Sequence, residues 1–298
     1  MKQYIYHILT IVLLFLTACE DVIEVKLYEE DLNLYAVEAK ITTNDEPYVY
    51  VYKGIPVDND GGFVGVSGAV VTVSDNQEPK NSVILVESSD ENGYYEVPFE
   101  LDYYGMAGRE YTLTIELPDV TLSATEFLAP VEPIDSIQVR PSLRGDNRFL
   151  GVFTFGFETP GLGDYYKWDV YINNSLLKSA EYIVVASDEF VDGNYIQSLE
   201  IFTDFHNPAE TDERMLQFMD EVQVKQTSIS EFAYNYYFQM FNQSQTGFLF
   251  SVPPANIKGN IHSSEGKEVL GLFTAHDVSA SNIVVIDESI ENQLDERQ

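Results

Sequence analysis

The chain has 298 residues and a formal net charge of −33, with 49 acidic and 16 basic side chains. This balance argues against a nucleic-acid-binding protein, because phosphate contacts need clustered Lys and Arg, and against adsorption on anionic lipid head groups. Hydrophobic residues make up 45% of the chain, including 20 Tyr and 18 Phe, so the composition also argues against a disordered chain.

Residues 1–18 have the layout of an export signal. Lys2 supplies a short positive start, residues 5–16 are apolar, and small residues follow them. This apolar stretch is shorter than the roughly 20 residues that a membrane-spanning helix needs. The sequence therefore predicts a signal peptide that is removed.

Cys19 is the only cysteine, so it cannot form an internal disulfide. Residues 16–19 (LTAC) resemble the lipobox of bacterial lipoproteins, which implies a covalent lipid on Cys19. Two or more acyl chains hold a protein on a membrane, since each buried methylene contributes about 0.8 kcal/mol. The alternative is an ordinary signal peptide with a coincidental cysteine.

The acidic Glu20 and Asp21 resemble the surface-export signal of Bacteroidota lipoproteins. We therefore expect residues 19–33 to be a lipidated tether and the protein to lie in the outer membrane, lipid-anchored at the cell surface.

Residues 34–130 are predicted to form an immunoglobulin-like β-sandwich. Alternation over residues 34–41 places Tyr35, Val37, Ala39 and Ile41 on the core face. Residues 108–113 (GREYTL) predict a tyrosine corner, in which the Tyr111 hydroxyl binds nearby backbone. Further strands, separated by turn signals, are predicted at residues 48–52, 69–74, 83–87, 94–99, 110–117 and 122–127.

Residues 134–287 are predicted to form a second, β-rich domain, after a connector with two prolines at residues 129–133. A capping box at residues 228–231 (SISE) predicts one α-helix near residues 229–243. Phe153, Phe155, Phe157 and Trp168 are assigned to the core, and residues 288–298 are predicted to be a solvated acidic tail. Strands are predicted at residues 135–140, 149–157, 165–172, 181–185, 198–205, 271–275 and 283–286. The fold class is therefore all-β, with one helix in the second domain.

Several segments, in this order, resemble one protein family. They are residues 37–42 (VEAKIT), 68–73 (GAVVTV), 122–125 (LSAT), 133–137 (PIDSI), 253–259 (PPANIKG) and 271–273 (GLF). Together with Cys19 they are similar to Bacteroidota lipoproteins of the domain-of-unknown-function family 4249. The resemblance implies an accessory lipoprotein that works beside a TonB-dependent outer-membrane transporter. Asn260 and residues 261–269 depart from the family pattern, which is richer in glycine there.

No nucleophile elbow, zinc-binding His-Glu-x-x-His pair or phosphate-binding loop occurs in the sequence. His206, His262 and His276 have no spacing that suits zinc and are interpreted as surface or loop histidines. We expect no catalytic residues, no metal and no cofactor beyond the lipid, so the protein is predicted not to be an enzyme. A glycosidase-type pair of acids stays open, because sequence cannot show the separation of two carboxylates.

Residues 58–62 (DNDGG) fit a hairpin turn, with a calcium loop as the alternative.

Tyr48, Tyr50 and Tyr52 alternate with Val49 and Val51, so valines in the core leave the tyrosines as an outward stripe. Such a stripe suits binding of sugars or of a protein partner. The alternative is that tyrosine simply favours strands.

The predicted function is that of a non-enzymatic outer-membrane lipoprotein, an accessory or ligand-presenting partner of a TonB-dependent outer-membrane barrel. The alternative is an independent glycan-binding or adhesion lipoprotein.

Overall fold

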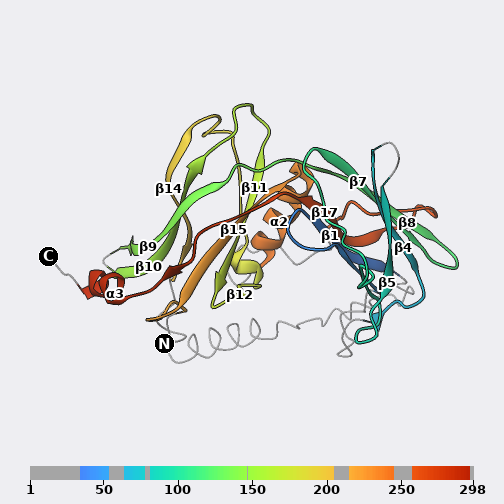
Figure 1. Ribbon diagram of the computed structural model, residues 1–298, viewed down its shortest axis with the longest axis horizontal. Helices are drawn as coiled ribbons and strands as arrows, with labels where there is room; N and C mark the ends of the chain where they lie inside the picture. Colours follow the sequence, from blue (N-terminus) through green and yellow to red (C-terminus); the bar gives the residue numbers. More distant parts are fainter. Residues whose placement is uncertain are drawn as a thin grey trace, which may run out of the picture. The chain divides into compact units, whose positions relative to one another are not determined.

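The structure is a computed structural model that describes residues 34–53, 64–77, 81–145, 147–204, 215–244 and 257–295. These residues belong to one compact unit, Asn33–Gln298. In this described part, the strands form sheets of ten, three and six strands, with helix α2 (Glu231–Ser244) beside strand β11 (Tyr165–Ile172) (Figure 1). The prediction of an all-β, sandwich-type fold is confirmed.

The ten-stranded sheet holds the first half of the chain. Its order is β16-β8-β7-β4-β5-β6-β2-β1-β17, and β3 pairs with β2. The strands are β1 (Tyr35–Thr42), β2 (Tyr48–Lys53), β3 (Val64–Gly65), β4 (Val70–Asp75), β5 (Ser82–Glu87), β6 (Tyr94–Glu96), β7 (Arg109–Glu116), β8 (Thr121–Leu128), β16 (His262–Ser263) and β17 (Val269–His276).

Side chains from both ends of this sheet share one hydrophobic core. Val37 and Val51 come from β1 and β2, and Val73 and Leu113 come from β4 and β7; each is at most 1% exposed. The core face predicted for residues 34–41 is largely confirmed, with Val37, Ala39 and Ile41 buried and Tyr35 half-buried. Two sheet faces thus close on one core, as in a sandwich.

Two strands of this sheet come from the end of the chain. β17 pairs in parallel with β1 over the full length of both strands, and β16 pairs with β8. The sequence predicted residues 134–287 as a separate second domain, whereas residues 262–276 of that range complete the first sheet. Alternation identifies residues 271–275 as a strand, but it does not tell which sheet the strand joins.

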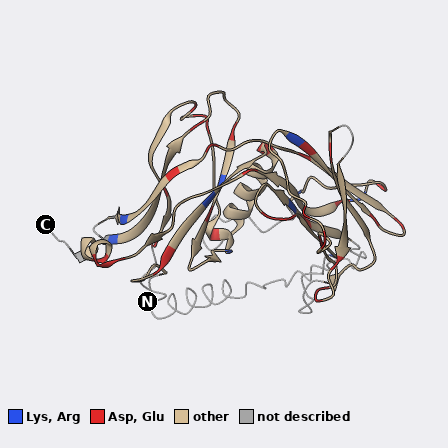
Figure 2. Ribbon diagram, viewed as in Figure 1, with Lys and Arg blue, Asp and Glu red and all other residues tan. Residues whose placement is uncertain are grey.

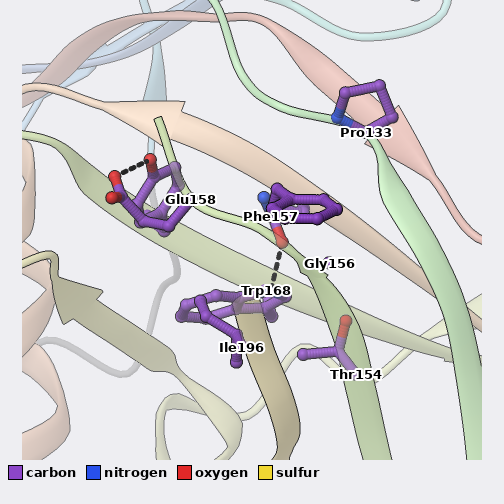
Figure 3. Close-up of a pocket in the computed structure, with 9 residues that line it drawn as sticks. Pro133, Thr154, Gly156, Phe157, Glu158, Trp168 and Ile196 are labelled. Atoms are coloured by element: carbon purple, nitrogen blue, oxygen red, sulfur yellow. Dashed lines mark hydrogen bonds between the residues drawn. The ribbon is translucent and has the colours of Figure 1, made fainter. Parts of the chain in front are cut away.

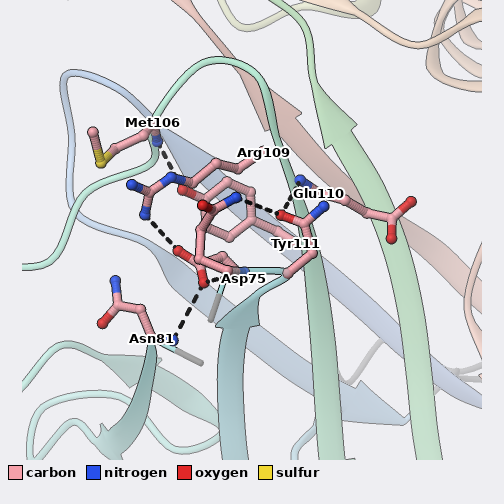
Figure 4. Close-up of polar contacts among 8 residues, drawn as sticks. Asp75, Asn81, Met106, Arg109, Glu110 and Tyr111 are labelled. Atoms are coloured by element: carbon pink, nitrogen blue, oxygen red, sulfur yellow. Dashed lines mark hydrogen bonds and ion pairs between the residues drawn. The ribbon is translucent and has the colours of Figure 1, made fainter. Parts of the chain in front are cut away.

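The predicted tyrosine corner is confirmed. The hydroxyl of Tyr111 accepts a hydrogen bond of 2.8 Å from the backbone N–H of Met106 (Figure 4). Beside it, Arg109 forms a 2.6 Å ion pair with Asp75, whose side chain is 0% exposed. Burial would raise the pKa of Asp75, but backbone hydrogen bonds and Arg109 lower it overall. The carboxylate therefore stays charged and fixes the end of β4.

A three-stranded and a six-stranded sheet form the second half. The first has the order β14 (Tyr195–Thr203), β10 (Asn147–Phe157) and β9 (Ile134–Arg144). The second has the order β12 (Ser175–Leu176), β11 (Tyr165–Ile172), β15 (Glu221–Ile229) and β18 (Val278–Ala280), with β13 (Val184–Ser187) paired to β11 and β19 (Val284–Val285) to β15. A short 3-10 helix, η1, spans Ala180–Tyr182.

The second core lies between these two sheets. Leu150 and Val152 of β10 meet Trp168 and Val170 of β11 in it. The indole N–H of Trp168 donates to Gln226 Oε1 at 2.9 Å beside a cavity of about 10 Å³, which has room for about one water (Figure 3). The assignment of Trp168 to the core is confirmed.

The assignment of the phenylalanine series to the core holds for Phe153, which is buried, but is wrong for Phe157, and Phe155 is half-buried. Phe153 is buried outside the second core, 4.0 Å from the guanidinium of Arg140, and Phe157 is 61% exposed. Register irregularities interrupt β10 after Val152 and again near Phe155. Leu150 and Val152 face the second core instead. Both faces of this strand carry apolar residues, so alternation alone does not tell which face points inward.

Helix α2 (Glu231–Ser244) confirms the predicted helix, but its cap differs from the prediction. Ser230 caps it, since its Oγ accepts a bond from the Ala233 N–H at 3.2 Å. Ser228, the predicted cap, accepts a bond from the N–H of Asp277 at 3.1 Å and donates to the carbonyl of Ala129. Ser228 therefore links β15 to the connector between the halves.

A second helix, α3 (Glu288–Asp295), occupies most of the predicted acidic tail. Asp287 caps it by accepting bonds from the N–H groups of Ser289 at 2.9 Å and Ile290 at 3.1 Å. Ile290 and Leu294, one helical turn apart, pack against the second core. The prediction of a solvated tail holds for the polar residues of this helix, which are mostly exposed, but is wrong for the face that carries Ile290 and Leu294.

Candidate functional site

Tyr48, Tyr50 and Tyr52 lie on the face of β2 that points away from the first core. Val49 and Val51 between them are 1% and 0% exposed, which confirms the predicted orientation. The three tyrosines are half-buried rather than fully exposed, because other rings pack beside them. Their role in binding stays a prediction.

Tyr94 of the neighbouring strand β6 extends this row to four rings. Its ring stacks on Tyr48 with centroids 5.7 Å apart and meets Tyr50 edge-on at 6.1 Å. The rings of Tyr50 and Tyr52 are 5.3 Å apart. We call Tyr48, Tyr50, Tyr52 and Tyr94 the tyrosine patch. Rigid rings with a polar tip suit contact with a sugar or a protein surface.

Glu38 of β1 places an exposed carboxylate at this patch. It lies opposite Tyr50 in the strand register and accepts a hydrogen bond of 2.8 Å from the Tyr48 hydroxyl. Burial, and then the negative charge of Glu38, raise the pKa of Tyr48. This phenol therefore remains neutral at physiological pH, and the patch combines neutral rings with the carboxylate of Glu38.

Helix α2 brings two more tyrosines to the border of the patch. Burial, and then the charges of Tyr52 and Glu38, raise the pKa of Tyr236. Tyr237 lies beneath the ammonium of Lys167, 5.4 Å from its ring centroid, and burial raises its pKa. The helix thus connects the patch with β11 of the second half.

Near this border, the charges of two lysines affect the pKa of a third. Burial lowers the pKa of Lys40; Asp45 and Asp169 oppose the shift, and Lys167 and Lys225 add to it. Lysines and arginines are sparse along the ribbon compared with acidic residues (Figure 2). Each ammonium lies near a tyrosine ring, at 5.4 Å for Lys40 and Tyr48, 5.4 Å for Lys167 and Tyr237, and 5.1 Å for Lys225 and Tyr171. These cation–π contacts hold the lysines in place.

A group of carboxylates in the second half, Glu158, Asp188 and Asp192, has oxygens within 4.8 Å of one another. Glu158 accepts a bond from the Tyr166 hydroxyl at 3.0 Å and one from the Gly193 N–H. Backbone N–H groups also donate to Asp188 at 2.9 Å and to Asp192 at 2.6 Å. These bonds explain the group as a scaffold for two loops.

His276 is buried in β17 and not at the surface, so the interpretation of the histidines is wrong for this residue. It is 4% exposed, and its Nδ1 lies 2.9 Å from the carbonyl oxygen of Ser228. Burial lowers its pKa to about 4. His262 is exposed on β16, as expected. His276 ends strand β17, which is buried over most of its length, and the spacing of the histidines in the sequence does not reveal this burial.

Cys19, His206 and residues 58–62 lie outside the described residues. The predictions of a lipid on Cys19 and of a turn or calcium loop at residues 58–62 therefore stay predictions.

A family model matches residues 20–282, and its description is a domain of unknown function, DUF4249. The chain belongs to this family. The DUF4249 match covers both halves of the described structure, including β16 and β17. No curated protein matches the chain. Among the described residues, no helix has the length and apolar character needed to cross a membrane.

Sequence reasoning found the row on β2 but not the residues around it. Alternation puts Glu38 on the face opposite the predicted core face of residues 34–41, and Tyr94 begins the strand predicted at residues 94–99. Their meeting with Tyr48 depends on the pairing of β1 and β6 with β2, which alternation within single strands does not reveal.

Proposed function

We propose that this DUF4249 protein is a non-enzymatic outer-membrane lipoprotein, held at the cell surface by acyl chains on Cys19. The observation that carries the proposal is the LTAC sequence at residues 16–19, which ends an apolar segment too short to span a bilayer. The family match begins at Glu20, so the proposed signal peptide lies outside the region that the family shares.

We further propose that the folded part is an accessory or ligand-presenting partner of a TonB-dependent transporter. The parallel pairing of β17 with β1, and the links from Ser228 to Ala129 and Asp277, join the two halves at several points. Such a body presents its surfaces in fixed positions, which suits a docking subunit. The charge of −33 favours a partner surface with basic residues.

Lipid attachment is tested with the full-length protein in its native host. Labelled palmitate should be incorporated, and the protein should partition into the detergent phase on Triton X-114 separation. Cys19→Ala should lose both properties. Affinity purification from solubilised outer membranes should recover a large barrel protein at native expression. A wild-type protein that incorporates no palmitate would contradict the proposed lipid anchor. Repeated purification without a barrel protein would contradict the proposed partner.

Glycan binding is the second candidate, and the specific observation that favours it is the combination of four tyrosine rings with Glu38. Ring faces can stack on a sugar while the carboxylate accepts bonds from its hydroxyl groups. On a glycan array, Tyr50→Ala should weaken binding by about tenfold or more, as expected for loss of a central aromatic contact. Tyr104→Ala is the matched control, since Tyr104 is 43% exposed elsewhere on the surface. Equal losses in both variants would contradict this role for the patch.

A further inference from the structure

A hollow of about 270 Å³ opens beside the first turn of α2, lined by residues that are not part of the tyrosine patch. Three segments form its walls: the end of β8 with the connector that follows it, residues 163–166, and residues 228–231. The volume lies just below the usual range of about 300–1,000 Å³ for ligand pockets. A small molecule, or one side chain of a partner, therefore has room here.

Aromatic rings supply part of the wall. Phe127, on the outer face of β8, is 51% exposed. Tyr165 is held by Tyr234 of α2, with ring centroids 5.2 Å apart. Two of the lining segments are also tied to each other, because the Ser228 hydroxyl donates to the carbonyl of Ala129. The cavity is thus preformed by packed side chains.

The charged residues that line the hollow are both acidic, Asp164 and Glu231. In the part of the chain that the structure describes, neither carboxylate forms a hydrogen bond or an ion pair. This contrasts with the nearby Glu158 and Asp188, whose oxygens accept bonds from backbone N–H groups. Burial, and then the charges of Glu158, Asp188 and Asp192, raise the pKa of Asp164. The field in the hollow is therefore negative.

We propose that this hollow binds an organic cation, an ammonium or guanidinium group, between the aromatic rings and the two carboxylates. Rings attract such a group through their faces, and a charge-assisted hydrogen bond to a carboxylate orients it. A bare metal ion fits less well. In the described residues, neither Asp164 nor Glu231 belongs to a group of three or more acidic, His or Cys side chains close enough together to share one ion. The site is separate from the lipid anchor and the tyrosine patch, so it extends the proposed function.

The test is calorimetric titration of the full-length protein in a non-ionic detergent. Choline and its neutral isostere 3,3-dimethylbutanol differ in charge but hardly in shape. Agmatine and the blocked peptide Gly-Arg-Gly carry the same guanidinium, and separate a small-molecule ligand from a peptide side chain. At least one cation should bind with a stoichiometry of one, and the isostere should bind about tenfold more weakly or not at all. No heat with any cation, or equal binding of choline and the isostere, would overturn the proposal.

Three variants place the binding at the hollow. Asp164→Asn and Glu231→Gln should each weaken binding about fivefold or more, and Phe127→Ala should weaken it to a similar degree. Asp119→Asn removes the same charge from an exposed residue that does not line the hollow and should leave the affinity unchanged within about twofold. Circular dichroism checks the fold of each variant. If Asp164→Asn is unfolded, Glu231→Gln decides alone, because Glu231 is exposed. If Asp119→Asn loses as much affinity, the binding is a diffuse counterion effect, and the proposal is overturned.

Discussion

The side-chain amide of Asn260 pairs with the backbone of Phe273 as a neighbouring strand would. Its Nδ2 donates to the Phe273 carbonyl at 2.8 Å, and its Oδ1 accepts from the Phe273 N–H at 2.9 Å. The same Nδ2 donates at 2.7 Å to Glu126, a carboxyl of β8 that is 8% exposed and whose pKa is raised by burial. Asn260 thereby ties β17 to β8.

Asn260→Ala should lower the free energy of unfolding by about 2–3 kcal/mol, because Phe273 loses two bonds and the buried Glu126 loses a donor. Urea unfolding followed by tryptophan fluorescence measures the change. Gln197→Ala, at an exposed residue of β14, is the control and should change stability by less than about 0.5 kcal/mol. Similar values for both variants would show that the Asn260 bonds contribute nothing net.

Gly271 allows the close approach of β17 to β1. Its φ of 93° lies in the left-handed region, and a Cβ placed there would come within 2.0 Å of the carbonyl oxygen of Val37. Gly271→Ala should therefore cost more than about 3 kcal/mol, since both the backbone angle and the strand spacing would have to change. Thermal unfolding tests this. The control is Gly108→Ala, where φ is 84° but the space around the residue is open. Its loss of stability should therefore be smaller and should reflect the backbone angle alone.

The first half could be predicted well because several of its strands, such as β2, β5, β7 and β8, alternate between buried and more exposed residues. Alternation gave the orientation of Val37 and Val49 directly. The partner of β17 could not be predicted, since a parallel strand that arrives from more than 200 residues away leaves no local pattern. Asn260 departs from the family pattern, but its part in the sheet could not be predicted because it depends on this pairing.

The second half shows a different kind of failure. β15 was not predicted, although Val222 and Val224 alternate and are both 0% exposed. Gln223 between them, with Lys225 and Gln226 after them, makes the strand look like a loop by composition. Here the pattern was present, and the apolar content was too low to stand out. In the candidate site, the row of tyrosines on β2 could be predicted from the sequence, whereas the contacts of Tyr94 and Glu38 with this row could not.

Removal of the Tyr111 hydroxyl should weaken the tyrosine corner. Tyr111 is 1% exposed, so Tyr111→Phe leaves the Met106 N–H without its partner and should cost about 1–2 kcal/mol. Chemical denaturation measures the loss. Tyr104→Phe removes a hydroxyl from an exposed ring two residues from Met106 and should be neutral. An unchanged midpoint for Tyr111→Phe would mean that water replaces the hydroxyl.

His276 should make the stability depend on pH between its unfolded and folded pKa values. Burial lowers the pKa of His276 from 6.5 to about 4, so in this window the unfolded chain binds a proton that the folded chain rejects. Its contribution is complete above pH 6.5 and is lost as the pH falls towards 4. The loss amounts to about 3 kcal/mol.

This pH effect is measured as a difference, because many carboxylates titrate in the same range. Urea unfolding of the wild type and of His276→Gln at pH 7 and pH 4 isolates it. The wild type should lose about 3 kcal/mol more than the variant on acidification. The control variant His262→Gln, at an exposed histidine, should lose as much stability as the wild type on acidification. Parallel curves for the wild type and His276→Gln would show that His276 is not kept neutral by burial.

Helix α3 predicts that the end of the chain contributes to stability, although its composition suggests a dispensable tail. Deletion of residues 288–298 removes Ile290 and Leu294 from the second core and should cost about 2–4 kcal/mol, since each loses part of its burial. Deletion of residues 296–298 alone keeps the helix and should have little effect. The double variant Ile290→Ser and Leu294→Ser should reproduce the longer deletion, because the stabilisation comes from the apolar face and not from the charged one. If the longer deletion unfolds at the same urea concentration as the wild type, α3 packs too weakly to stabilise the fold.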